Sequence, residues 1–144
     1  MHPLYTKAAP LTQVAIDSAI EVQNHLGVGL LESVYQKCLM RELALRGHSV
    51  RTEVPVTVHY KGYEFTENLR IDLLVDDSLV IECKALEEGR ENMILHKAQT
   101  LSYLKLMDLP LGLILNFGNP QLRHGRRGIA RVILKGADSE EVPF

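Results

Sequence analysis

Apolar residues recur at helical spacing in three parts of the chain. Between residues 11 and 26 they stand three or four positions apart, which predicts an amphipathic helix that ends at Gly27. The same period over residues 30–46 predicts a second helix, with Gly47 as its C-terminal cap. A third helix is predicted over residues 92–107.

Elsewhere the chain carries two patterns that are typical of β-strands. Alternation of apolar and polar residues predicts two strands with one solvated face each, separated by the turn Lys61-Gly62. Mainly apolar runs predict three further strands. Because Pro55 cannot donate a ladder hydrogen bond, its strand should lie at a sheet edge or carry a bulge there. The predicted strands are 50–60, 63–75, 79–85, 111–117 and 129–134.

This order of elements predicts an α/β fold. Two N-terminal helices precede a three-stranded antiparallel meander, and a helix and two strands follow, so we expect a mixed central sheet flanked by helices. The 144 residues correspond to a single domain, 1–144.

Composition narrows the function classes. Sixteen Lys and Arg against eighteen Asp and Glu give a net charge of −2, which excludes a strongly basic nucleic-acid binder. The two cysteines, Cys38 and Cys83, form neither a disulfide framework nor a metal-ligand pair, so a reducing, cytoplasmic location is expected. The longest apolar run, 109–115, is too short to cross a membrane.

Two acidic residues are predicted to face each other in the sheet. If the turn Asp76-Asp77-Ser78 is centred on Asp77, Asp72 lies opposite Glu82, on the face that also carries Lys84. Like charges in this position are destabilising unless a cation lies between them. The alternative is an edge salt bridge between Lys84 and the acids in a slightly different register. The opposite face would carry Ile71, Leu73, Ile81 and Cys83.

Two helices carry polar residues that could border a cleft. Glu32 shares an otherwise apolar stripe with Tyr35, Leu39 and Leu43, although taken alone its position favours a role at the positive end of its helix dipole. The third helix has a polar stripe that could line a cleft wall or simply face solvent. The members of this stripe are Asn92, His96, Gln99 and Tyr103, with Leu95, Ala98 and Leu101 beside them.

Positive charge gathers near the C-terminus. Residues 109–137 contain five basic and no acidic residues. The Gly-rich loop 118–128, with Arg126 and Arg127, could hold a phosphate backbone, or it could be a solvated loop without a partner.

These elements together resemble a known nuclease superfamily. Asp72 followed by Glu82-Cys83-Lys84 is similar to the acidic and E-x-K motifs of the PD-(D/E)xK nucleases, although Ile71 stands where a proline often precedes the acid. Residues 29–35 read G-x-x-E-x-x-Y, the hallmark of the GxxExxY family within that superfamily. Residues 99–103 resemble its Q-x-x-x-Y element, and residues 113–118 its closing strand. The resemblance covers about residues 11–135.

The resemblance implies a restriction-endonuclease-like core and a metal-dependent nuclease acting on nucleic acid, with DNA as the expected form. Asp72, Glu82 and Glu32 would bind Mg²⁺ or Mn²⁺, and Lys84 would orient or deprotonate the attacking water. A homodimer would be needed to cut both strands of a duplex. The alternative is a catalytically silent module of the same fold that binds nucleic acid or a protein partner. The remaining implied residues are Gln99, Tyr103 and Tyr35 in supporting roles and Arg126 and Arg127 on flanking phosphates.

Overall fold

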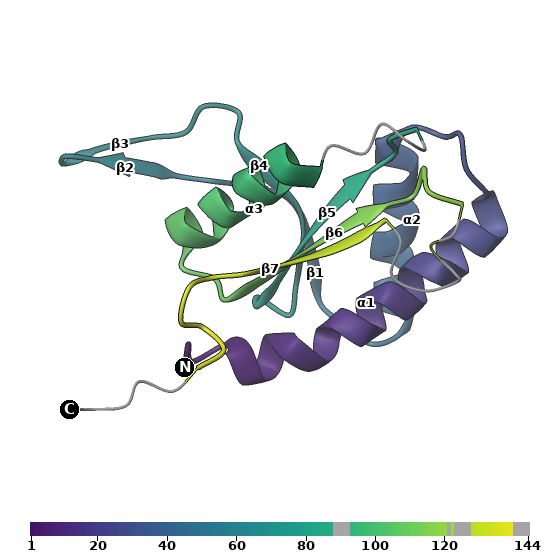
Figure 1. Ribbon diagram of the computed structural model, residues 1–144, viewed down its shortest axis with the longest axis horizontal. Coiled ribbons are helices and arrows are strands. Elements are labelled where there is room, and N and C mark those ends of the chain that lie inside the picture. Colours follow the sequence, from purple (N-terminus) through teal and green to yellow (C-terminus); the bar gives the residue numbers. More distant parts are fainter. Residues whose placement is uncertain (88–92, 121, 123–127, 140–144) are drawn as a thin grey trace.

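The computed structural model describes the chain apart from residues 88–92, 121, 123–127 and 140–144. Figure 1 shows a twisted central sheet between helices. The helices are α1 (Tyr5–Leu26), α2 (Glu32–Leu45) and α3 (Met93–Met107). The strands are β1 (Val50–Pro55), β2 (Val58–Tyr60), β3 (Tyr63–Phe65), β4 (Arg70–Val75), β5 (Leu79–Lys84), β6 (Leu111–Asn116) and β7 (Ile129–Ile133).

The main sheet is mixed, as predicted. Its five strands lie in the order β1-β4-β5-β6-β7, and every neighbouring pair is antiparallel except β5 and β6. Parallel neighbours need a crossover connection, and α3 supplies it between β5 and β6. The fold is therefore an α/β sheet flanked by helices, consistent with the predicted restriction-endonuclease-like core.

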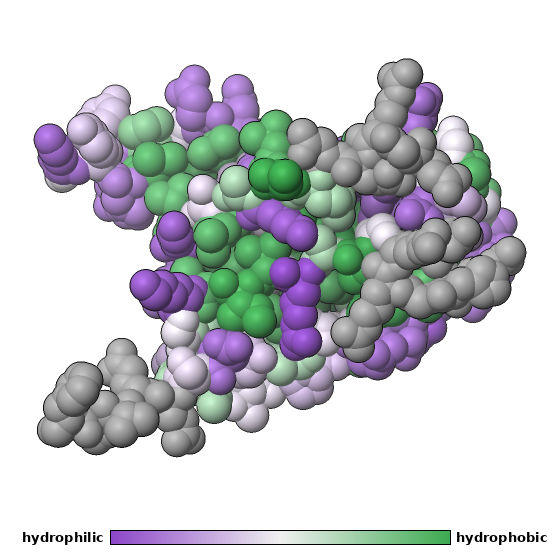
Figure 2. All heavy atoms as spheres, viewed as in Figure 1, coloured by the Kyte–Doolittle hydropathy of each residue, from purple (hydrophilic) through white to green (hydrophobic). Residues whose placement is uncertain are grey.

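Each face of the sheet has its own hydrophobic core. The α1 and α2 helices cover one face, where Leu73, Ile81 and Cys83 are completely buried. The α3 helix covers the other face through Tyr103 and Leu104. Figure 2 shows hydrophobic side chains over much of the middle of the visible face, with hydrophilic ones among them and along the rim. Of the residues expected together on the first face, Ile71 packs instead in the α3-side core.

The predicted first helix begins too late in the chain. The α1 helix starts at Tyr5, and Pro10 lies inside it. Pro10 lies past the first turn, where a proline removes one intrahelical hydrogen bond and crowds the preceding turn. Ala8, ahead of that proline, is completely buried, so packing supports the extra turns.

The first two predicted strands are each divided in two. The edge strand β1 ends at Pro55, as expected of a proline at a sheet edge, and the chain then leaves the main sheet. The β2 and β3 strands form a separate two-stranded hairpin that projects from the body (Figure 1). Its turn is Lys61-Gly62, as predicted, with both φ angles positive, at 47° and 80°.

Candidate active site

The turn around Asp77 sets the register that brings two acids together. Asp76 and Asp77 both have positive φ, and Ser78 N–H donates to the Val75 carbonyl at 3.0 Å. The strand partners that follow are Val75 with Leu79, Leu74 with Val80 and Leu73 with Ile81. This is the predicted register, and its next position places Asp72 beside Glu82.

The main-chain ladder between β4 and β5 ends just before these acids, and their side chains continue the contact. The Asp72 N–H donates to Glu82 Oε1 at 3.4 Å, and the Cys83 N–H donates to Asp72 Oδ2 at 2.8 Å. On its other side, β5 remains paired with β6 through Lys84. Each carboxylate is therefore held by the backbone of the opposite strand, at the point where β4 and β5 separate.

Burial makes it costly for both acids to be ionised at once. The Glu82 side chain is 4% exposed, and burial, followed by the charge of Asp72, raises the pKa of Glu82 to about 9. Burial also raises the pKa of Asp72, whereas the Cys83 N–H and the charge of Lys84 oppose that shift. Near neutral pH the pair therefore keeps a proton on Glu82.

Lys84 belongs to the same cluster without a direct ion pair. It follows Glu82 by two positions on β5, and its positive charge opposes the rise in the pKa of both acids. Within the part of the chain that the structure describes, no ion pair joins Lys84 to either acid. The edge salt bridge considered from the sequence is therefore absent among the described residues, and the ammonium group acts at longer range.

Glu32 lies at the same end of the sheet but outside the acidic pair. It is the first residue of α2 and is exposed, while the rest of its stripe, Tyr35, Leu39 and Leu43, is completely buried. Its charge adds to the raised pKa of the Cys83 thiol, which is due chiefly to burial. Among the described residues, no three His, Cys, Asp or Glu side chains form a metal-binding group. The structure therefore brings Glu32 near the pair but not into one ligand set with it.

Tyr35 fixes the loop that leads to Glu32. Its hydroxyl donates to the Gly27 carbonyl at 2.6 Å and accepts the Leu30 N–H at 3.2 Å. Its ring stacks on Phe117, with centroids 4.7 Å apart. Because Tyr35 is completely buried, it supports the site structurally and does not offer a surface to nucleic acid.

The α3 helix places one member of its polar stripe beside the acids. Tyr103 is 6% exposed, and burial, followed by the charges of Glu82 and Asp72, raises the pKa of its phenol. His96 lies near enough to Lys84 to feel its charge: burial lowers the pKa of His96, and Lys84 lowers it further. Gln99 is exposed.

The apolar residues beside the polar stripe of α3 differ in burial. Leu95 is 68% exposed and Ala98 is exposed, whereas Leu101 is partly buried against the α3-side core. The helix packs on the sheet through Thr100, Tyr103 and Leu104, which are buried. Asn92 lies outside the described residues.

Sequence reasoning missed the role of Asn116 at the end of β6. Its side-chain oxygen accepts the N–H groups of Leu86 at 2.8 Å and of Gly118 at 3.1 Å. A Cβ on Gly118 would collide with the Leu86 backbone, so glycine is required there. These contacts fix the chain just after Lys84. A completely buried asparagine that ends an apolar strand was the available signal.

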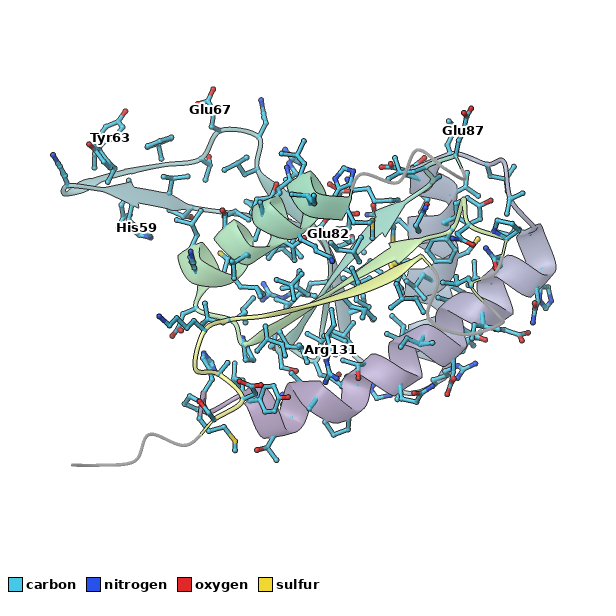
Figure 3. The ribbon with its side chains drawn as sticks, in the orientation of Figure 1. His59, Tyr63, Glu67, Glu82, Glu87 and Arg131 are labelled. Carbon is cyan, nitrogen blue, oxygen red and sulfur yellow. The ribbon has the colours of Figure 1, made fainter. Side chains whose placement is uncertain are left out.

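The structure describes only part of the basic loop 118–128. Arg126 and Arg127 lie outside the described residues, so their contact with phosphates stays a prediction. Figure 3 shows Arg131 on β7 and Glu82 on β5. Among the described residues, no helix combines the length and hydrophobicity needed to cross a membrane.

Comparison with known proteins identifies the family. No curated protein matches the chain. A solved structure titled "Crystal structure of SSO0001" is similar, with 18% sequence identity, a TM-score of 0.41, and coverage of 86% of this chain and 77% of that one. A family model described as the PD-(D/E)XK nuclease superfamily matches residues 9–132, which includes the acidic pair and Lys84. The chain therefore belongs to the PD-(D/E)XK nuclease superfamily.

Proposed function

We propose that this protein is a divalent-metal-dependent nuclease of the GxxExxY type that hydrolyses phosphodiester bonds, with DNA as substrate. The observation that carries the proposal is the contact between Asp72, which is partly buried, and Glu82, which is buried, with Lys84 on the same face. Two carboxylates that can hold a metal ion, next to a lysine ammonium group, suit the hydrolysis of a phosphodiester bond. We treat residues 11–135 as one catalytic domain.

The donor set suits a hard cation. Carboxylate oxygens are preferred ligands of Mg²⁺ and Mn²⁺, and Mg²⁺ keeps several waters when few protein ligands are present. Asp72 and Glu82 would hold the ion, and Glu32 would join them through water. When bound, the ion supplies an acidified water and neutralises charge on the phosphoryl oxygens.

The chain's own residues account for orientation and for the remaining charge. The Cys83 N–H and the Asp72 N–H fix the two carboxylates, so their oxygens stay aimed into the site. The Lys84 ammonium orients the attacking water or stabilises the charge that develops on phosphate. Tyr103, which is buried on α3, borders the α3 side of the acidic pair.

Substrate contacts and assembly complete the proposal. We assign Gln99, Arg126 and Arg127 to the nucleic-acid backbone, and a homodimer to the cutting of both strands. Cys38 and Cys83 are free thiols, which fits a reducing compartment, and we propose the cytoplasm.

A cleavage panel tests the proposal. Single- and double-stranded DNA and RNA are incubated with Mg²⁺ or Mn²⁺ and with wild type, Lys84→Ala or Lys105→Ala. Lys105 is an exposed residue in the last turn of α3 and serves as the matched control. Lys84→Ala should cut at least about a hundredfold more slowly, since it removes charge stabilisation worth several kcal/mol. Lys105→Ala should cut like wild type.

Two other outcomes would change the proposal. Equal cleavage by wild type and Lys84→Ala would refute the assigned role of Lys84. Binding to nucleic acid in a gel shift without metal, together with no cleavage in either metal, would instead support a catalytically silent binding module.

A further inference from the structure

The β1–β4 ladder is interrupted at one position, beside the acidic pair. Thr52 pairs with Leu73 and Val54 pairs with Ile71, but the position between them, Glu53 opposite Asp72, makes no ladder pair. Glu53 has a φ of 51°, a left-handed conformation that is strained for a residue with a side chain. It is the one non-glycine residue within a described strand that has positive φ.

A side chain from α2 occupies the gap in the ladder. Gln36 Nε2 donates to the carboxylate of Glu53 at 2.8 Å and lies 3.4 Å from the Asp72 carbonyl oxygen. It therefore stands in for the main-chain donor that Asp72 would have met in a regular ladder. Gln36 follows Glu32 by one helical turn, so both side chains lie on the same side of α2.

Glu53 also acts on Asp72 through its charge. Burial is the main reason that the pKa of Asp72 is raised, and the negative charge of Glu53 raises it further. Glu53 itself is exposed at the sheet edge. Glu53 thus combines a strained backbone, a hydrogen bond from the Gln36 amide and a negative charge close to Asp72.

We propose that Gln36 and Glu53 are positioning residues for Asp72. The Gln36 amide holds the Asp72 main chain where the ladder is missing, and Glu53 anchors that amide. The Asp72 carboxylate consequently stays aimed at the Cys83 N–H and at Glu82, and the charge of Glu53 strengthens cation binding. The part that concerns a cation rests on the proposed function, whereas the part that concerns Asp72 does not.

Three substitutions separate the hydrogen bond from the charge. Gln36→Leu removes the amide. Glu53→Gln keeps the acceptor for Gln36 but removes the charge. Glu53→Gly removes both while accepting the positive φ, which protects the fold. Gln13→Leu is the matched control, because Gln13 makes a comparable exposed hydrogen bond to Asp17 within α1.

The first readout needs no metal. Amide hydrogen exchange is measured by NMR at Cys83, whose N–H is held by the Asp72 carboxylate, and at Val80 on the same strand as reference. Gln36→Leu and Glu53→Gly should speed exchange at Cys83 by about tenfold relative to Val80, whereas Glu53→Gln and Gln13→Leu should not. Equal acceleration at both amides would show a general loss of stability and would overturn the proposal.

The second readout is Mn²⁺ affinity by calorimetry. Gln36→Leu should weaken binding by about tenfold or more, as is usual when a residue that supports a metal ligand is removed. Glu53→Gln should weaken it by about threefold through lost charge alone. Wild-type affinity in both variants would overturn the proposal. The wild type could bind no Mn²⁺ while Gln36→Leu and Glu53→Gly still speed exchange at Cys83. That result would refute the proposed metal dependence and leave the positioning of Asp72 established.

Discussion

Replacing Glu82 by glutamine should stabilise the metal-free protein at neutral pH. Glutamine has the shape of a protonated glutamic acid, so it can accept the Asp72 N–H and donate to the Asp72 carboxylate. It has no proton to lose. The wild-type residue keeps its proton in the folded state, where burial raises the pKa of Glu82 from 4.5 to about 9, and loses it on unfolding.

The size of the effect follows from that shift. Between the unfolded and folded pKa values, the unfolded state binds fewer protons than the folded state, so wild-type stability falls as pH rises from about 4.5 to about 9. Each pH unit in this window corresponds to about 1.4 kcal/mol. At pH 7 Glu82→Gln should therefore gain up to about 3 kcal/mol. For a chain of this size that gain corresponds to about 10 °C in Tm.

Thermal melts in the presence of a chelator measure the effect. Wild type and Glu82→Gln are compared at pH 5, 7 and 8.5, with Glu67→Gln as the control, since Glu67 is exposed in the loop before β4 (Figure 3). The difference in Tm between Glu82→Gln and wild type should be small at pH 5 and should increase at each higher pH. A Tm difference that is absent, or that is the same at all three pH values, would refute the reasoning that the acidic pair keeps a proton.

Three further predictions concern the metal and the loops that support the site. Mn²⁺ binding at pH 7 should release about one proton, because the ion replaces the proton of the acidic pair; calorimetry in two buffers of different ionisation enthalpy measures this. Tyr35→Phe should lower the free energy of unfolding by about 1–2 kcal/mol, because the Gly27 carbonyl and the Leu30 N–H lose their partner; denaturant titration measures it, and an unchanged midpoint would contradict it. Gly118→Ala should lower Tm far more than a surface substitution, because its Cβ would meet the Leu86 backbone; an unchanged melt would show that this contact relaxes freely.

Local patterns in the sequence were enough to predict that Asp72 and Glu82 lie beside each other. A turn centred on Asp77 sets the strand pairing by arithmetic alone, and the predicted facing of Asp72 and Glu82 depends only on that turn. On the face opposite the acids, β4 and β5 carry apolar residues of the core under α1 and α2. A slip of one residue in the strand register would bury the acids in that core. Register was therefore strongly determined.

Tertiary contacts determined the features that the sequence did not predict. Alternation of apolar and polar residues continues past Pro55 in the sequence, so the alternation did not show where β1 ends and β2 begins. The contact between Gln36 and Glu53 joins two polar residues that look solvated in their own elements. The exposed position of Leu95 likewise depends on which side of α3 the sheet accepts.

The separation of β4 from β5 at the acidic pair has a consequence for assembly. At that end, β1 and β4 are joined to β5, β6 and β7 by carboxylate contacts and not by a continuous ladder. Asp72 lies on β4 and Glu82 lies on β5, so neither half of the sheet contains both acids. The proposed activity can therefore arise only after both halves have docked, and a newly made or partly unfolded chain would be unable to cut nucleic acid.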